Sequence, residues 1–140
     1  MNGMFGMGMK TFRVFLLLSS AFVLFSCGVG TFPVQTYGPY RNFTWADQTF
    51  SYGYSEVALD STSYQVSFAD IDHAEADRLS LYRSAELTDQ HGFDYFIVSG
   101  TSGGSATKTI RMYKGDTPTD NPSAYNAKSM LTTMGPTINK

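Results

Sequence analysis

The 140-residue chain is long enough for one domain, and its charge is unevenly distributed. All 12 acidic residues follow Ser26, whereas two of the 10 basic residues, Lys10 and Arg13, precede it. The part after Ser26 therefore carries eight basic and twelve acidic side chains, a formal charge of −4, which argues against nucleic acid as a partner and against a polybasic membrane patch.

The chain begins with the features of a secretory signal peptide, which we expect to cover residues 1–26, with translation starting at Met9. A short basic start is followed by an apolar run, residues 14–25, that only Ser19 and Ser20 interrupt. A run of about a dozen apolar residues is short for a membrane span, which needs about 20. A basic start, a short apolar run and a small-residue boundary together predict export.

Leu24-Phe25-Ser26-Cys27 resembles the lipobox of bacterial lipoprotein precursors, with an aliphatic residue at Leu24 and a small one at Ser26. The resemblance implies that a peptidase cuts between Ser26 and Cys27 and that Cys27 carries acyl chains such as palmitate. The alternative is an ordinary exported protein, cut near Ser26, in which Cys27 is an incidental thiol. Cys27 is the only cysteine, so no disulfide can form within the chain.

The resemblance to lipoproteins also implies a location. Two or more acyl chains would hold the protein stably on a bilayer, because each buried methylene contributes about 0.8 kcal/mol. Gly28, in place of an aspartate after the cysteine, is similar to lipoproteins that are passed on to the outer membrane. We therefore expect a cell-envelope protein at the periplasmic face of the outer membrane, with membrane lipid and an envelope protein as its partners.

Residues 27–49 are expected to form a tether, because Pro33 and Gly38-Pro39 interrupt regular structure. This segment is rich in aromatic residues, so its part from 40 to 45 is expected to pack onto the domain. Aromatic side chains here could bind a partner protein or a glycan. The alternative, which we favour, is that the rings complete the core. The candidate interaction residues are Tyr37, Tyr40, Trp45, Tyr52 and Tyr54.

Residues 50–140 are expected to form a single α+β domain. Residues 50–59 and 63–68 predict a β-hairpin, with a bulge near Ser55-Glu56 that would reconcile the two parities of apolar residues in the first strand. Residues 74–90 lack glycine and proline and predict a long helix, capped by Asp70 or Asp72 and ended by Gly92.

Two further strands and a short helix are expected after the long helix. Residues 93–98 have apolar groups of both parities and predict a central strand, and residues 107–113 predict another strand with Ile110 and Met112 facing inward. Residues 124–134 predict a short helix that covers the leucines of the long one. The expected fold is a two-layer sandwich with a four-stranded, mainly antiparallel sheet (ββαββ) and one long helix packed on one face.

Four stretches in this order resemble a family of small bacterial lipoproteins that has no assigned biochemical activity. The resemblance supports the lipoprotein interpretation and the α+β fold, and it implies no catalytic residues. The stretches are Gly53-Tyr54-Ser55-Glu56, Tyr64-Gln65-Val66-Ser67-Phe68, Arg83-Ser84-Ala85-Glu86-Leu87-Thr88 and Gly92-Phe93-Asp94-Tyr95-Phe96.

No motif in the sequence predicts catalysis, a metal site or a cofactor. His73 and His91 lie at opposite ends of the predicted helix, about 27 Å apart at 1.5 Å per residue, too far to share a metal ion. Glu56 and Glu86 are candidate carboxylates for acid–base chemistry, but Arg83 lies three residues before Glu86 and favours a structural ion pair.

The sequence therefore predicts a membrane-anchored envelope lipoprotein whose small domain has an interaction or structural role. The competing interpretation is a small periplasmic enzyme or ligand-binding module. Clustered polar groups in a pocket would favour the enzyme or binding module, whereas a sheet face filled by aromatic side chains would favour the interaction role.

Overall fold

The computed structural model describes residues 31–102 and 106–140, so the predicted signal peptide, Ser26 and Cys27 lie outside the described residues. Residues 33–140 form one compact unit, in which each of two helices follows three strands. The elements are β1 (Arg41–Trp45), β2 (Gln48–Ala58), β3 (Ser63–Ala69), α1 (His73–Gln90), β4 (Tyr95–Ser102), β5 (Thr107–Tyr113), β6 (Ala124–Asn126) and α2 (Ala127–Met134), followed by a 3-10 turn, Gly135–Thr137.

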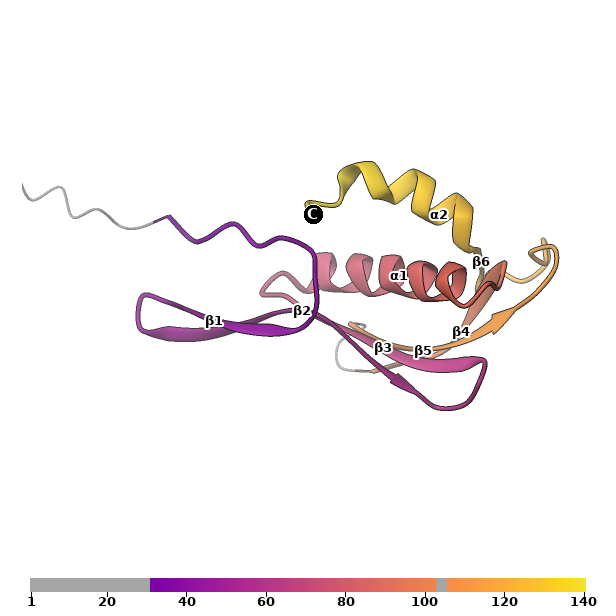
Figure 1. The fold of residues 1–140 in the computed structure, drawn as a ribbon, viewed down its shortest axis with the longest axis horizontal. Helices are drawn as coiled ribbons and strands as arrows, with labels where there is room; N and C mark the ends of the chain where they lie inside the picture. Colours follow the sequence, from indigo (N-terminus) through magenta and orange to yellow (C-terminus); the bar gives the residue numbers. More distant parts are fainter. Residues whose placement is uncertain (1–30, 103–105) are drawn as a thin grey trace, which may run out of the picture. The chain divides into compact units, whose positions relative to one another are not determined.

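Among the described residues the strands form one six-stranded sheet in the order β1-β2-β3-β5-β4-β6, and each pair of neighbours is antiparallel. Figure 1 shows both helices on the same side of this sheet, with α1 next to the strands and α2 over α1. The predicted architecture, a four-stranded sheet covered by one long helix, is therefore wrong. The sheet has two more strands, β1 and β6, whereas the predicted short C-terminal helix is present as α2.

The sequence pattern does not predict β1 and β6, for a different reason in each case. β1 lies in the segment that its prolines and glycine predict to be a tether, and its regularity comes from pairing with β2 through a tight turn at Ala46 and Asp47, both with positive φ. β6 has three residues, too few to show an alternating pattern, and its pairing with β4 is what makes it a strand. The pairing of β1 is local but its turn lacks glycine, whereas the pairing of β6 depends on a strand about 30 residues earlier in the chain.

Helix α1 begins and ends with the predicted groups. The Asp72 carboxylate accepts hydrogen bonds from the backbone N–H groups of Ala74 and Glu75, and Gly92 has the left-handed φ of +74° just beyond the helix. Its buried face is more polar than expected. Three hydroxyl residues bond to carbonyl oxygens one turn back, which satisfies them inside the core: Ser80, Ser84 and Thr88.

Strand β2 changes its pairing partner at Gly53. The bulge predicted near Ser55-Glu56 is absent. The first half of the strand pairs with β1 and its second half with β3, in an unbroken register from Gly53 to Ala58. Gly53 has φ +111°, and a Cβ there would lie 2.4 Å from the Pro39 carbonyl oxygen, so only glycine fits. The apolar residues of the other parity in this strand do not need a bulge to reach the core. Val57 faces away from the helices and is 58% exposed.

The core consists of two apolar clusters beneath and beside α1. Residues of α2 pack against both of them, which confirms that the C-terminal helix covers Leu79 and Leu87. The first cluster comprises Val66, Ala85, Leu87, Phe96, Ile110, Met112 and Ala127. The second comprises Tyr52, Phe68, Leu79, Tyr82 and Ile138.

Candidate functional site

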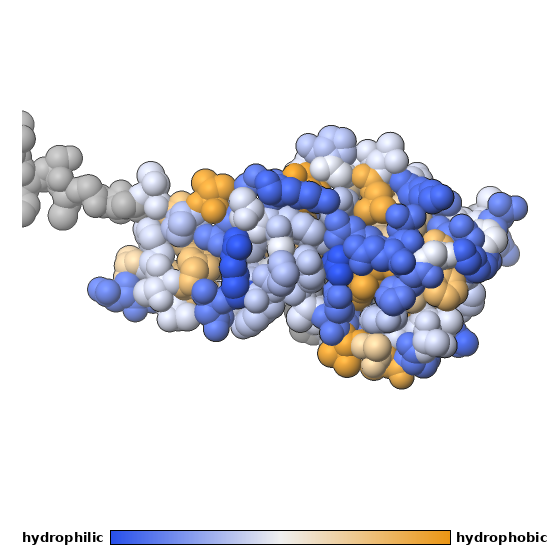
Figure 2. All heavy atoms as spheres, viewed as in Figure 1, coloured by the Kyte–Doolittle hydropathy of each residue, from blue (hydrophilic) through white to orange (hydrophobic). Residues whose placement is uncertain are grey.

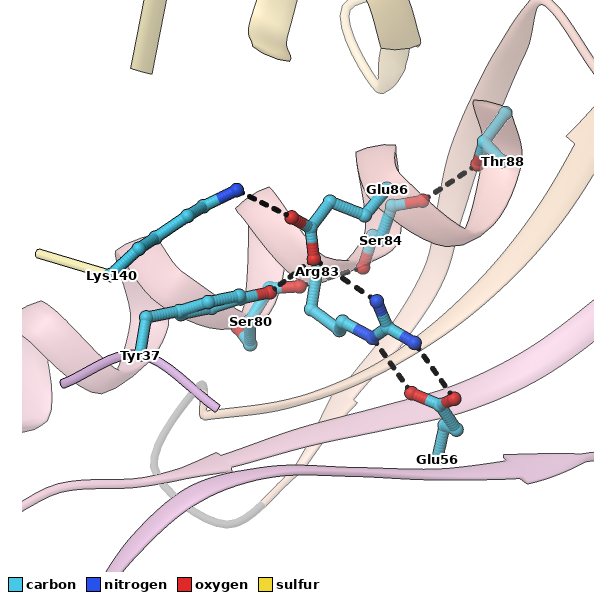
Figure 3. A network of polar contacts seen from close by, with 8 residues as sticks. All are labelled: Tyr37, Glu56, Ser80, Arg83, Ser84, Glu86, Thr88 and Lys140. Atoms are coloured by element: carbon cyan, nitrogen blue, oxygen red, sulfur yellow. Dashed lines mark hydrogen bonds and ion pairs between the residues drawn. The ribbon is translucent and has the colours of Figure 1, made fainter. Parts of the chain in front are cut away.

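The most distinctive polar group of the described residues is Arg83, in the middle of α1, which is only 7% exposed. Its guanidinium donates two hydrogen bonds to the Glu56 carboxylate of β2, from Nε to Oε2 at 2.8 Å and from Nη2 to Oε1 at 2.9 Å. A third bond runs from Nη1 to Oε2 of Glu86 at 3.0 Å, as the spacing of three residues predicted. Figure 3 shows Arg83 between the two carboxylates, which joins the helix to the sheet.

Glu86 extends the network to both ends of the described domain. The Tyr37 hydroxyl donates to Glu86 Oε2 at 2.6 Å, and Lys140 Nζ donates to Oε1 at 3.2 Å (Figure 3). The backbone follows the same path, because the Tyr37 N–H donates to the Asn139 carbonyl at 2.6 Å. We call Tyr37, Glu56, Arg83, Glu86 and Lys140 the charge cluster. It fastens the segment before β1 to the last residues of the chain.

Aromatic rings surround the charge cluster. The Tyr54 ring lies 4.2 Å from the Arg83 guanidinium carbon, a cation–π contact in a desolvated setting. The Tyr37 ring lies 5.3 Å from Tyr54 and 5.3 Å from Tyr82, centre to centre. These rings cover the Arg83 guanidinium and limit the access of water to it, which strengthens its bonds to the carboxylates.

The environment favours the ordinary protonation states of Tyr37, Arg83 and Glu86 at neutral pH. Burial alone would raise the pKa of the Glu86 carboxyl, but hydrogen bonds from Tyr37, Arg83 and Lys140 outweigh burial and hold the pKa below its ordinary value. Burial, assisted by the hydrogen bond to Glu86, raises the pKa of the Tyr37 hydroxyl. Burial lowers the pKa of Arg83, but its bonds to the two carboxylates more than compensate and leave it raised.

This arrangement has the chemistry of a structural ion-pair network that joins the helix to the sheet. Both carboxylates that could form an acid–base pair are bonded to one guanidinium, and the pKa of the Glu86 carboxyl is lowered, away from the range that proton exchange near neutral pH requires. Every buried side-chain nitrogen and oxygen among the described residues has a hydrogen-bond partner. A second ion pair also joins the sheet to the helix, because the buried Lys108 ammonium of β5 bonds to Asp77 of α1.

Two surface grooves lie away from the charge cluster. One, of about 380 Å³, is lined by the first half of β2, the end of β3 and the start of α1, including Phe50, Phe68, Asp70 and His73. The other, of about 300 Å³, runs along β6 and α2. No member of the cluster lines either groove. Within residues 31–102 and 106–140, no three His, Cys, Asp or Glu side chains come together as ligands for a metal ion.

The five aromatic residues predicted as an interaction surface fall into two groups. Tyr52 belongs to the second core cluster, and Tyr37 and Tyr54 pack against it. Tyr40 is 51% exposed, and Trp45 lies half-buried on β1. The structure therefore brings three of these rings to the core and leaves two on the β1–β2 hairpin. The predicted cleavage and lipidation residues, Ser26 and Cys27, lie outside the described residues.

Sequence reasoning missed two charged residues of these ion pairs, Lys140 and Lys108. Nothing in the local sequence indicates a partner for Lys140, which reaches Glu86 only because the chain end folds back over α1. Lys108 did carry a signal, since it shares the parity of the inward-facing Ile110 and Met112 in β5. A charged residue of that parity points to a buried ion pair.

No known protein family, curated protein or solved structure matches this chain. Neither helix of the described part has the length and apolar character that a membrane crossing requires.

Proposed function

We propose that this protein is a cell-envelope lipoprotein, acylated at Cys27 and held at the periplasmic face of the outer membrane. Its domain has an interaction or structural role. The observation that carries this proposal is the lipobox-like Leu24-Phe25-Ser26-Cys27, which closes a short apolar run and contains the only cysteine. The resemblance of four later stretches to a family of small lipoproteins supports the same assignment.

The geometry of the charge cluster supports a structural role for these residues and not a catalytic one. An acid–base pair needs at least one carboxyl group whose pKa is raised toward neutrality. The pKa of Glu86 is held below its ordinary value instead, and Glu56 is bonded by the same guanidinium. A small periplasmic enzyme or binding module would have to use another surface, such as the groove between β3 and α1.

The test is to replace Cys27 and follow both the lipid and the location of the protein. Wild-type protein labelled with an alkyne-bearing fatty acid is expected to carry the label and to sediment with outer membranes. The Cys27→Ser variant should lose the label and leave the outer-membrane fraction. Ser26→Ala is the matched control, because it keeps a small residue before the cut and should be labelled and sorted normally. Unlabelled wild-type protein, or unchanged membrane association of Cys27→Ser, would contradict the proposal.

A further inference from the structure

The β1–β2 hairpin is amphipathic. Side chains alternate between the faces of a strand, and the register pairs Phe43 with Phe50 and Trp45 with Gln48 on one face. The rings of Phe43 and Phe50 stack with their centres 5.6 Å apart, so we call Phe43, Trp45 and Phe50 the aromatic face, which Arg41 and Gln48 border on the same side of the strands. The opposite face is polar and consists of Asn42, Thr44, Thr49 and Ser51.

The aromatic face extends beyond the core. Phe43 packs against the second core cluster, whereas Trp45 and Phe50 belong to neither cluster of the described residues, and all three side chains are half-buried. From Arg41 to Ser51 the only charged residues are Arg41 and Asp47. Figure 2 shows hydrophobic patches over this hairpin and over the segment that precedes it. A surface with aromatic rings and few charges suits the interface between lipid and water.

The charge cluster determines where the chain enters the hairpin. Tyr37 is bonded to Glu86 and to the Asn139 carbonyl, and Arg41 Nη2 donates to the Thr36 carbonyl at 3.1 Å. The domain therefore holds the segment before β1 in one place, beside the hairpin. Val34, 83% exposed, lies in this segment.

The anchor limits how far this segment can lie from a membrane. Six residue steps separate Cys27 from Pro33, and a fully extended chain of that length spans about 20 Å. A five-residue strand such as β1 is itself about 17 Å long. The hairpin is therefore within reach of the bilayer that holds the acyl chains.

We propose that the aromatic face of the β1–β2 hairpin lies in the interfacial layer of the membrane to which Cys27 is anchored. This inference rests on the proposed function, because the acyl chains bring the hairpin to the lipid. The occupant of the aromatic face is a lipid surface, and the rings of Phe43, Trp45 and Phe50 give the domain one orientation on it. Trp45 suits this position because its indole is apolar over most of its area and carries one N–H that can bond to water or a headgroup, while Phe43 and Phe50 add apolar area beside it.

Trp45 is the only tryptophan, so its fluorescence reports the environment of the hairpin directly. The mature acylated protein is reconstituted into vesicles of equal parts phosphatidylethanolamine and phosphatidylglycerol. A second set of vesicles carries bromine atoms on the acyl chains near the headgroups. We expect emission from Trp45 to be lower in the brominated vesicles, because bromine quenches a ring only at close contact.

A relocated tryptophan is the matched control. The double variant Trp45→Phe with Leu59→Trp moves the reporter to the far end of β2, about 35 Å away along the strand, at an exposed apolar position. It should show no loss of emission in brominated vesicles. In the wild-type background, Phe43→Ser with Phe50→Ser should reduce quenching of Trp45, whereas Thr44→Ser with Thr49→Ser on the polar face should leave it unchanged.

Flotation of the same vesicles separates this inference from the proposed function. Protein that floats with the vesicles but shows equal emission in both would leave the lipoprotein assignment standing and overturn the docking of the hairpin. Protein that carries no lipid and does not float would overturn both. Emission that changes with protein density and not with bromine would assign the aromatic face to a second copy of the chain, which also overturns the inference.

Discussion

The charge cluster and the β1–β2 hairpin share strand β2, yet their side chains are organised in opposite ways. In the second half of the strand, Glu56 is bonded by the buried Arg83 and takes part in a network that joins four segments of the chain. In the first half, Phe50 stacks on Phe43 across a hairpin that extends past the helices. Gly53 separates the two halves.

This difference distinguishes a part of the molecule in which charged groups join four segments of the chain from a part in which aromatic rings lie half-buried on a hairpin. The cluster is centred on the buried Arg83, and removing that guanidinium leaves the carboxylates of Glu56 and Glu86 without their shared partner, so the cluster is sensitive to substitution at Arg83. A half-buried aromatic face contributes less to folding, because much of its area stays accessible in the folded state. Substitutions in the cluster should therefore lower stability, whereas substitutions on the aromatic face should alter membrane contact.

The largest effect is expected for Arg83→Met, which leaves two carboxylates facing an apolar side chain. We expect the free energy of unfolding in urea to fall by about 3–5 kcal/mol. Arg78→Met is the control, because Arg78 pairs with Glu75 at the surface with its side chain 34% exposed, and should cost about 1 kcal/mol or less. Equal losses in the two variants would remove the distinction between the cluster and an ordinary surface pair.

A second test concerns the junction between the two regions. Gly53→Ala forces a Cβ toward the Pro39 carbonyl and a residue into φ +111°, so a loss of about 3 kcal/mol is expected in the same denaturation experiment. Gly100→Ala is the matched control in β4, since the new methyl meets only the Thr109 side chain at 3.9 Å. Its expected effect is under about 1 kcal/mol in either direction. A tolerated Gly53→Ala would contradict the partner change described for β2.

Tyr37→Phe removes a single hydroxyl from the cluster. Because that hydroxyl donates to an ionised carboxylate, a loss of about 1.5–3 kcal/mol is expected. Tyr40→Phe removes a comparable hydroxyl, bonded to Ser51 on the exposed side of the hairpin, and should change stability by no more than about 0.5 kcal/mol. If the two substitutions had the same effect, the segment before β1 would not be fastened by Glu86.

The cluster should also make stability depend on acid. Because the pKa of Glu86 is lower in the folded protein than in the unfolded chain, its contribution is complete above the ordinary glutamate value of about 4.3 and is lost as the pH falls through the folded pKa. Unfolding monitored between about pH 6 and pH 2 should therefore show less acid sensitivity in Glu86→Gln than in wild type. An identical slope in both proteins would place the acid-sensitive groups elsewhere.

The smallest effect on folding is expected at the end of the hairpin. Trp45→Thr should alter the free energy of unfolding by about 1 kcal/mol or less, because Trp45 is only half-buried and lies at the end of the hairpin. Tyr82→Thr, which opens the second core cluster, should cost about 3–5 kcal/mol by comparison. A large loss for Trp45→Thr would mean that the aromatic face belongs to the core.

Local patterns in the sequence were sufficient for most elements of the domain. The helix caps at Asp72 and Gly92 were predicted because capping depends on residues within one turn. The inward parity of Ile110 and Met112 was predicted because alternation is a property of the strand itself. The pairing of Arg83 with Glu86 follows from a spacing of three residues on one helix.

Tertiary structure alone decided the number of strands and the extent of the charge cluster. β6 is a strand because β4 supplies its hydrogen-bond partners from about 30 residues earlier in the chain, and β1 is a strand because it pairs with β2 across a turn without glycine, Ala46-Asp47, that no turn motif indicates. Tyr37 and Lys140 meet at Glu86, 49 and 54 residues away along the chain, because the folded sheet and α2 bring the chain ends over α1. Short-range periodicity determines which residues form an element, whereas long-range pairing determines which elements meet and which side chains lose their water.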